Sequence, residues 1–293
     1  MNRLLFKYIK KMTFLPQKIY LPIVHKQFTG KKLNLKNPIE FNAKLQWLKA
    51  YYHPKLLNKL VDKYAVREYV IEKIGEQYLN ELYGVYDSFE EIDFDKLPNE
   101  FVLKAVHSSS SNIVCKDKTK LDFKKAKKST NKWLKTNKYH KTGQEWAYKD
   151  VKPRLVVEKY LIDKKTNDLI DYKFYCFNGE PKFLVAQSDK LGRSFYDLDW
   201  NKCDFRKKVI PTYAVNKPSN FDELKILAKK LAQNLPFVRV DFYSVDNKSY
   251  FGEMTFYPAD ARNDFYPDKY NKIIGDMIKL PDLNGRKEIT TFN

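Results

Sequence analysis

The chain has 293 residues, 43% of them hydrophobic and 15% aromatic, which indicates a globular protein with a substantial core rather than a disordered one. No run approaches 18 apolar residues, so we expect no membrane-spanning helix, and residues 1–9 lack the apolar core and cleavage site of a secretory signal peptide. The three cysteines are widely spaced, which excludes a disulfide framework and a standard structural zinc site and favours a cytoplasmic protein.

The charge of the chain is strongly positive and unevenly distributed. The net charge is +19, and residues 1–60 hold thirteen Lys or Arg but one acid, Glu40. A second basic run, residues 116–141, holds eleven lysines against two aspartates. Such surfaces attract nucleic acid, anionic lipid headgroups or phosphate-bearing substrates. A lysine-rich surface without any such partner explains the composition equally well, so charge alone identifies no ligand.

The expected elements change in character along the chain. Residues 1–60 are expected to form short helices broken by Pro16, Pro22, Pro38 and Pro54, with an amphipathic segment over 38–52. One helix is expected over residues 61–75. Then follow strands 101–106 and 113–115, helix 123–135, strand 155–161, strands 171–177 and 181–186 around an Asn-Gly turn, helix 221–235 and a hairpin over 238–255.

Strand pairs interleaved with helices predict an α+β architecture with more than one lobe. We divide the chain into three parts: a basic, mainly helical N-terminal region (residues 1–95), an N-lobe with a hairpin of small residues (96–160) and a C-lobe with a carboxylate pair (161–293).

The hairpin over residues 238–255 carries the clearest chemical pattern. If its turn centres on Asn247, Val245 pairs with Ser249 and Asp241 lies directly opposite Glu253. Because side chains alternate along a strand, Arg239 and Thr255 share the face of the two carboxylates. The other face is apolar and is expected to point into the core: Val238, Val240, Phe242, Met254 and Phe256.

Two opposed carboxylates repel each other unless a positive charge lies between them. Mg²⁺ shared between carboxylates and substrate phosphates would remove this repulsion, and Arg239 would contact a phosphate oxygen. The alternative is an exposed strand face on which Arg239 or surface lysines neutralise both acids. A shift of one residue in the register would abolish the pattern.

A second candidate lies at Lys104, on a strand that leads through His107 into four consecutive serines, residues 108–111. Small residues such as Ser109 and Ser110 allow backbone N–H groups to approach a triphosphate, and Lys104 supplies a point charge. No Walker motif is present, because the turn contains no glycine. Ordinary turn chemistry explains the serines as well, and a lone histidine is more often packed than functional.

A third candidate is the apolar strand that ends in Glu158, Lys159, Tyr160 and Leu161. A polar loop then leads to Asp171 and Lys173. Such a strand end is compatible with an adenine slot between two lobes, where ligands commonly bind. An edge strand with a solvated end is an equally good interpretation.

Together these features resemble the ATP-grasp superfamily, and more closely its TupA-like family, which is associated with teichuronopeptide and other bacterial surface polysaccharides. The resemblance covers most of residues 30–275. It is carried by residues 37–48, 62–70, 174–181, 238–242 and 252–258. The sequence departs from the family pattern in three places: serines replace the glycines after His107, Ala261 stands where a glycine is usual, and Ala43 stands where a glutamate is common.

The resemblance implies two α+β lobes that clamp ATP, and a role for each matching residue. Lys63 and Lys104 would contact the phosphates, residues 158–161 would line the adenine, and Asp171 would lie near the ribose. Arg239 would contact a phosphate, and Asp241 and Glu253 would hold Mg²⁺. We include His107, Ser109, Ser110 and Lys173 among the nucleotide-binding residues, and Thr255 as a further metal ligand.

The implied reaction is ATP-dependent formation of an amide between an amine and a uronic acid of a capsule, O-antigen or cell-wall precursor. The basic N-terminal region would face anionic lipid or an anionic glycan at the inner face of the membrane. Four alternatives stay open: a glycosyltransferase, a glycan kinase, a basic nucleic-acid-binding module and an ATP-grasp protein that binds without catalysis.

Overall fold

The computed structural model describes residues 12–164, 166–207 and 214–292. Residues 1–9, for which the sequence predicts no signal peptide, lie outside this part. The longer helices are α2 (Gln17–Thr29), α3 (Phe41–Tyr51), α4 (Leu56–Val61), α5 (Val66–Lys73), α6 (Phe123–Leu134), α7 (Lys138–Lys141), α8 (Phe221–Ala232) and α9 (Lys269–Asp276). The strands are β1 (Leu82–Tyr86), β2 (Phe101–Ala105), β3 (Asn112–Cys115), β4 (Leu155–Lys159), β5 (Asp171–Phe177), β6 (Glu180–Ser188), β7 (Gly192–Asp197), β8 (Arg206–Lys207), β9 (Phe237–Val245), β10 (Lys248–Thr255) and β11 (Phe265–Tyr266).

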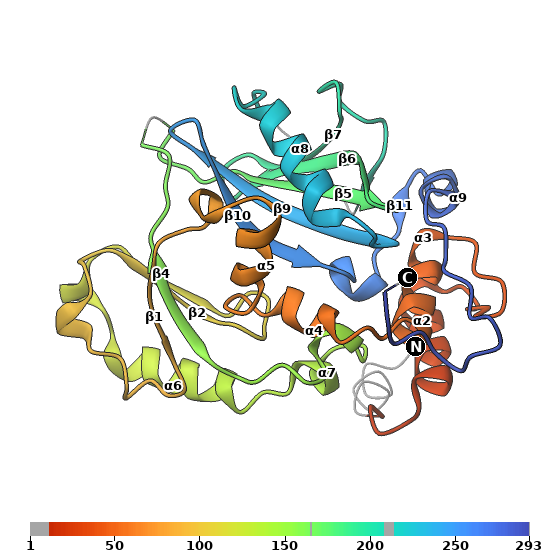
Figure 1. Ribbon diagram of the computed structural model, residues 1–293, viewed down its shortest axis with the longest axis horizontal. Helices are drawn as coiled ribbons and strands as arrows, with labels where there is room; N and C mark the ends of the chain where they lie inside the picture. Colours follow the sequence, from red (N-terminus) through yellow and green to blue (C-terminus); the bar gives the residue numbers. More distant parts are fainter. Residues whose placement is uncertain (1–11, 165, 208–213, 293) are drawn as a thin grey trace.

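The strands form two main antiparallel sheets, which confirms the predicted α+β architecture (Figure 1). The smaller sheet has the order β1-β4-β2-β3, and α6 packs its buried Ala126 against the apolar residues of β2 and β4. The sequence analysis missed β1, whose residues are all half-buried and show no alternation. Because β1 begins at Leu82, the smaller sheet starts before residue 96, where the sequence analysis begins the N-lobe. The division of the chain into three parts stays a prediction.

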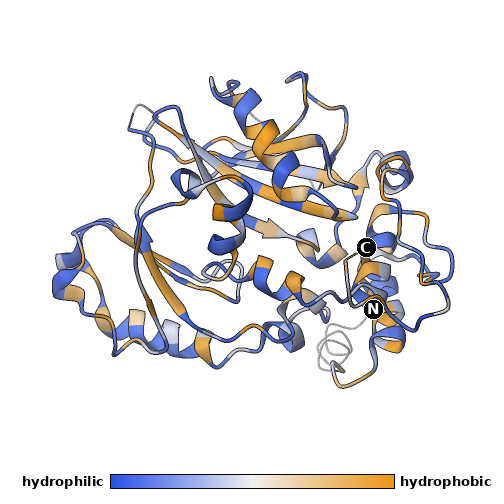
Figure 2. Cartoon of the chain, in the orientation of Figure 1, coloured by the Kyte–Doolittle hydropathy of each residue, from blue (hydrophilic) through white to orange (hydrophobic). Residues whose placement is uncertain are grey.

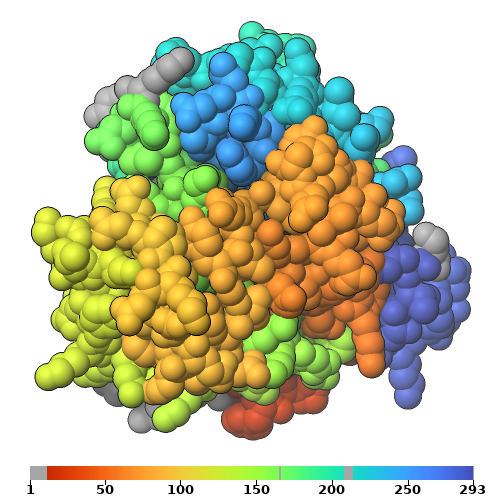
Figure 3. Space-filling model, turned by 60° about the vertical axis from the view of Figure 1, so that its left-hand side comes forward, coloured from red at the N-terminus to blue at the C-terminus, as the bar shows by residue number. Residues whose placement is uncertain are grey.

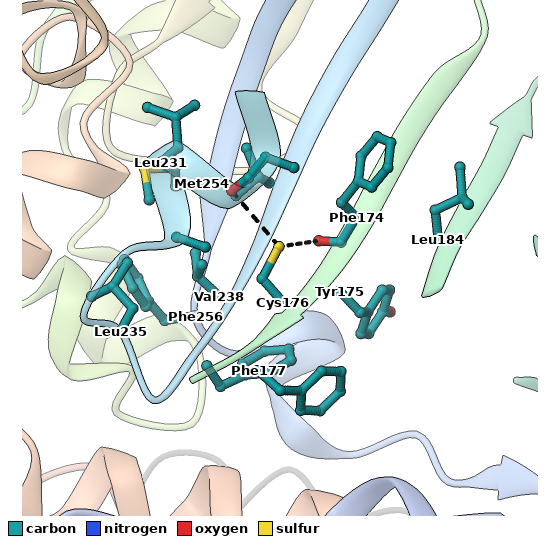
Figure 4. Packing of buried hydrophobic residues seen from close by; sticks show 14 of the residues in the cluster. Phe174, Tyr175, Cys176, Phe177, Leu184, Leu231, Leu235, Val238, Met254 and Phe256 are labelled. Atoms are coloured by element: carbon teal, nitrogen blue, oxygen red, sulfur yellow. Dashed lines mark hydrogen bonds between the residues drawn. The ribbon is translucent and has the colours of Figure 1, made fainter. Parts of the chain in front are cut away.

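The larger sheet has the order β10-β9-β5-β6-β7, and α8 covers one of its faces. Val238, Val240 and Phe242 are fully buried on this face, as the alternation predicts. Figure 4 shows Val238 and Met254 beside Leu231 of α8, with the thiol of Cys176 directed at the carbonyl oxygens of Phe174 and Ala228. Figure 2 shows hydrophobic residues along these strands, while α8 carries both colours because only one of its faces is buried.

An aromatic cluster attaches the N-terminal helices to the opposite face of the larger sheet. The ring of Phe41, the first residue of α3, lies 5.2 Å from Phe237 and 5.4 Å from Phe265 between ring centroids. Helix α2 packs on α3 in turn. From residue 12 on, the N-terminal region is therefore part of the folded body and not a separate arm.

Two sequence predictions about helices were wrong. Pro22 lies inside α2 and does not end it, because a proline removes only one backbone donor from the helix. The helix expected over 61–75 is interrupted at Asp62, whose carboxylate accepts hydrogen bonds from the backbone N–H groups of Tyr64 and Ala65 at 2.8 and 3.0 Å. Asp62 thereby ends α4 and stabilises the turn that leads into α5, as short polar side chains do by bonding to nearby backbone N–H groups.

Among the described residues, no helix is both long and apolar enough to cross a membrane. The three cysteines are all free, as expected from their spacing.

Candidate active site

The β9–β10 hairpin has the predicted pairing of Asp241 with Glu253. Its turn, however, is shorter than expected, and a bulge in β10 restores the predicted register. The turn consists of Asp246 and Asn247, both with positive φ, so Val245 pairs with Lys248 and not with Ser249. A bulge at Gly252 then shifts the pairing by one residue. A Cβ atom on Gly252 would lie 3.0 Å from the carbonyl oxygen of Asp241, so a larger residue would crowd this bulge.

The two carboxylates lie among cations. Asp241 is fully buried and accepts two hydrogen bonds from Arg239, at 2.7 and 2.6 Å, and one from Lys173 at 3.0 Å. Glu253 accepts a hydrogen bond from Arg239 at 2.8 Å, and the amine of Lys63 lies 3.7 Å from it. Asp241 is buried and Glu253 is 31% exposed, so the face is not fully exposed, but Arg239 does neutralise both acids as the alternative interpretation expected.

The electrostatics of this network keep Glu253 ionised. Burial raises the pKa of Glu253, but three cations outweigh burial and lower it to about 2: Lys63, Arg239 and Lys173. Burial lowers the pKa of Arg239, but the charges of Asp241 and Glu253 outweigh it and raise that pKa. At neutral pH the carboxylate of Glu253 is thus available as an anionic ligand.

The donor set fits a magnesium ion that is shared with a phosphate ligand. Within the described residues, no three His, Cys, Asp or Glu side chains lie close enough to hold a metal ion by themselves. Two opposed carboxylates with a substrate phosphate are, however, the usual arrangement for Mg²⁺. The hydroxyl group of Thr255, the third predicted ligand, donates to Glu253 at 3.2 Å.

A cleft between the two sheets opens beside these carboxylates. One pocket of about 750 Å³ and a second of about 460 Å³ share Lys63, Lys104, Asn112, Tyr243 and Gly252. The larger pocket also contains all four residues that the sequence predicts around adenine: Glu158, Lys159, Tyr160 and Leu161. Glu253 lines the smaller pocket. Figure 3 views the molecule from the side of the smaller sheet, whose yellow residues lie below the green and blue residues of the larger one.

Lys63 reaches the cleft because of the break between α4 and α5. Its backbone N–H donates to Val106 at 3.2 Å and its amine to the carbonyl of Ser108 at 2.8 Å, so it bridges from the helices to the serine hairpin. Lys104 donates to Glu158 at 2.6 Å, and Arg67 lies 3.7 Å from the same carboxylate. A bound phosphate would compete with Glu158 for Lys104.

The serine hairpin contributes three of its four serines to the smaller pocket: Ser108, Ser110 and Ser111. Ser109 is exposed outside it and accepts a hydrogen bond from Lys138 at 2.9 Å. His107 is buried with its Nε2 3.0 Å from the carbonyl oxygen of Trp133, so it packs against the end of α6 and does not face the cleft. A packed histidine is the alternative that the sequence analysis left open for this residue.

Asp171 and Lys173 lie outside both pockets, on the sheet face that carries Asp241. Lys173 donates to Asp171 at 2.8 Å as well as to Asp241. Burial raises the pKa of Asp171, and its Oδ1 atom is buried without a hydrogen-bond partner in the structure. Lys173 therefore links the predicted ribose-side acid to the metal-side acid.

Four polar residues of the larger pocket were missed by the sequence analysis: Arg67, Asn80, Asn112 and Tyr243. Two of them had a local signal. Tyr243 continues the alternation of Arg239 and Asp241, and Asn112 pairs directly with Lys104 across the β2–β3 hairpin. Arg67 and Asn80 reach the cleft only through tertiary packing, where Arg67 donates to the carbonyl of Asn80 at 3.0 Å.

Ser110 has a φ of 57°, in the region that favours glycine. We expect Ser110→Gly to raise the free energy of unfolding by about 0.5–1 kcal/mol, because a left-handed conformation disfavours residues with a Cβ atom. Urea denaturation measures this change. The matched control is Ser111→Gly, where φ is not positive; stabilisation of both variants alike would contradict the explanation.

The comparisons with known proteins agree with this geometry. A model described as TupA-like ATPgrasp matches residues 43–279. The chain belongs to the TupA-like ATP-grasp family. Membership confirms the predicted family and the ATP-grasp fold, whereas the role of each site residue stays a prediction.

Solved structures resembling this member of the TupA-like family include D-alanine–D-alanine ligase from Helicobacter pylori, at 17% identity and a TM-score of 0.47 over 76% of this chain. This chain covers 61% of that ligase. The Bacillus anthracis D-alanine–D-alanine ligase complexed with ATP matches at 15% identity and a TM-score of 0.44, over 81% of this chain and 70% of the other. Phosphoribosylamine–glycine ligase from Thermotoga maritima matches at 14% identity and a TM-score of 0.40, over 71% and 50%. No curated protein matches significantly.

Proposed function

We propose that this chain, an ATP-grasp ligase by family, uses ATP and Mg²⁺ to join a carboxylate to an amine. The observation that carries the proposal is the Asp241–Glu253 pair, whose Glu253 lines a cleft that also contains Lys63 and Lys104. Carboxylates, phosphate-binding cations and an apolar slot in one cleft are the parts that phosphoryl transfer needs.

The proposed reaction has two steps. The γ-phosphoryl group of ATP passes to a carboxylate oxygen, giving an acyl phosphate and ADP. An amine nitrogen then attacks the acyl carbon, loses its proton and expels phosphate, leaving an amide. The protein contributes positioning and charge neutralisation more than covalent chemistry.

Each part of the cleft has a proposed role in this reaction. Residues 158–161 and the side chains of Val102 and Leu169 would enclose the adenine. Lys63, Lys104 and the backbone of the serine hairpin would contact the phosphates. Arg239 would neutralise charge on the transferred phosphoryl group. Mg²⁺, held by Asp241 and Glu253 together with phosphate oxygens, would offset the negative charge of the triphosphate.

The acceptor is proposed to be a uronic acid of a bacterial surface polysaccharide precursor, with an amino acid or another amine as the second substrate. Two observations support this choice. The sequence resembles a family that is associated with bacterial surface polysaccharides, and its net charge of +19 favours an anionic substrate. We further propose a cytoplasmic location, where ATP is present and the three free cysteines stay reduced.

Calorimetry of ATP binding with and without Mg²⁺ tests the site. We expect Mg²⁺ to tighten ATP binding, and Glu253→Gln to remove that gain, a loss of about tenfold or more in affinity. The matched control is Glu180→Gln, which changes an exposed glutamate paired with Lys229 outside the cleft. Equal affinity with and without Mg²⁺ in all three proteins would rule out the metal site, and no ATP binding at all would rule out the ligase.

ADP release then separates the ligase from its alternatives. A ligase releases ADP when a uronic acid and an amine are both present and forms one amide for each ADP. A kinase releases ADP without the amine, and a binding-only protein releases none. Mass spectrometry of the product decides between these results.

A further inference from the structure

Helix α2 exposes apolar side chains on the face opposite its packing surface. Tyr20, Leu21 and Val24 are buried in the cluster that joins α2 to α3. Ile19 is 53% exposed and Ile23 is 39% exposed. Because they are four residues apart, they lie on one side of the helix. Phe14, just before the helix, is 78% exposed, so three large apolar side chains in this segment are left uncovered by the residues that the structure describes.

Positive charges surround these side chains, and acids are absent from the sequence before Glu40. Residues 1–39 contain nine Lys or Arg and no Asp or Glu. Lys18 and Lys26 are exposed on α2 itself, and Lys32 and Lys36 are exposed in the segment that follows. An exposed apolar stripe flanked by lysines is the pattern of a helix that lies in the interface of an anionic membrane.

The other basic surface of the chain differs in this respect. Helix α6 and the residues around it expose six or more lysines. The exposed apolar residue of this helix, Phe123, packs edge-on against Phe94, with 5.0 Å between the ring centroids. Phe123 is 43% exposed, but it is a single exposed apolar residue on α6, whereas Ile19 and Ile23 form a pair on one side of α2. A second copy of the chain docked through the same helix would bring the exposed Lys18 and Lys26 of both copies together, and these like charges repel each other.

We propose that α2, with Phe14, docks on an anionic membrane surface, burying Ile19 and Ile23 at the boundary of headgroups and acyl chains while Lys18 and Lys26 contact anionic headgroups. The inference goes beyond the ligase reaction and does not depend on it. Figure 1 shows α2 at the opposite end of the molecule from the smaller sheet, so this contact leaves the lobe of β1–β4 away from the membrane.

Vesicle flotation with the full chain, without nucleotide, tests the proposal. The probes are vesicles of phosphatidylcholine alone and of phosphatidylcholine with phosphatidylglycerol at low salt. We expect binding to the anionic vesicles only. Ile19→Ser/Ile23→Ser, which leaves the charge unchanged, is expected to weaken binding by about tenfold or more. Lys18→Gln/Lys26→Gln is expected to weaken it by a similar factor, because each lysine near an anionic surface contributes about fivefold.

Two matched controls are available on the same chain. Ile71→Ser/Ile226→Ser removes two equally exposed isoleucines from α5 and α8, and Lys124→Gln/Lys128→Gln removes two exposed lysines from α6. Both controls are expected to bind like the unmodified chain, and circular dichroism verifies that every variant is folded. The proposal is overturned if anionic vesicles bind no protein, if Ile19→Ser/Ile23→Ser has no effect, or if the α6 variant loses as much binding as the α2 variants. It is also overturned if α2 instead mediates a dimer in size-exclusion chromatography that the isoleucine variant abolishes.

Discussion

Replacing Asp241 with asparagine is expected to lower the free energy of unfolding by about 3–5 kcal/mol, which corresponds to a fall in Tm of about 10 °C. The side chain of Asp241 is 1% exposed and lies against both Arg239 and Lys173. Neutralising it leaves two buried cations with less negative charge to balance them, and removing one partner of a buried ion pair has a larger effect than removing an exposed one. Thermal and urea denaturation of Asp241→Asn measure the loss.

Glu253→Gln is the comparison for this experiment. Its side chain is 31% exposed, so the same chemical change should lower stability by only about 1 kcal/mol. Because the pKa of Glu253 is lowered to about 2, its contribution is fully present above its unfolded pKa near 4.5 and is lost as the pH falls toward 2. The difference between Glu253→Gln and the unmodified chain should therefore shrink on acidification. Equal stability losses for the Asp241 and Glu253 variants would contradict the assignment of Asp241 as the buried centre of the network.

Lys207→Met is expected to stabilise the protein at neutral pH. The Lys207 amine is buried without a hydrogen-bond partner in the structure, 4.4 Å from the centroid of Phe265 and 5.0 Å from that of Phe41. Burial, with smaller contributions from Arg193 and Arg239, lowers the pKa of Lys207 to about 7. The aromatic faces and the charge of Asp264 offset part of this penalty, but among the described residues the amine has no hydrogen-bonded anionic partner.

The sign of the pH dependence follows from the two protonation states. Below about pH 7 the lysine is charged in both the folded and the unfolded chain, so folding buries a cation and the penalty is complete, on the order of 5 kcal/mol at 1.36 kcal/mol per pKa unit. Between pH 7 and the unfolded pKa of 10.5 only the unfolded chain binds the proton, so the stability of the unmodified chain rises with pH. The advantage of Lys207→Met should thus be largest at pH 6 and nearly vanish at pH 10. Urea denaturation at both values checks this, with exposed Lys230→Met on α8 as the control; an advantage independent of pH would contradict the prediction.

Local chemistry in the sequence was enough to determine the central hairpins. The Asn178-Gly179 turn forms with both residues at positive φ, and strand β5 has the bounds expected for it. The two-residue alternation placed Arg239, Asp241 and Glu253 on one face, because that alternation depends only on backbone geometry. The family pattern added Lys63 and Lys104 to the same cleft.

The tertiary structure decided how these residues meet. The pairing of Asp241 with Glu253 depends on the Gly252 bulge, which compensates for a turn one residue shorter than the sequence suggested. His107 packs against α6, and Lys207 is enclosed by aromatic rings from α3 and β11, contacts that join residues more than 20 positions apart. Turn types and strand faces are set by a residue and its immediate neighbours, whereas the burial of a side chain and its ion-pair partners are set by the packing of distant segments, which no local pattern records.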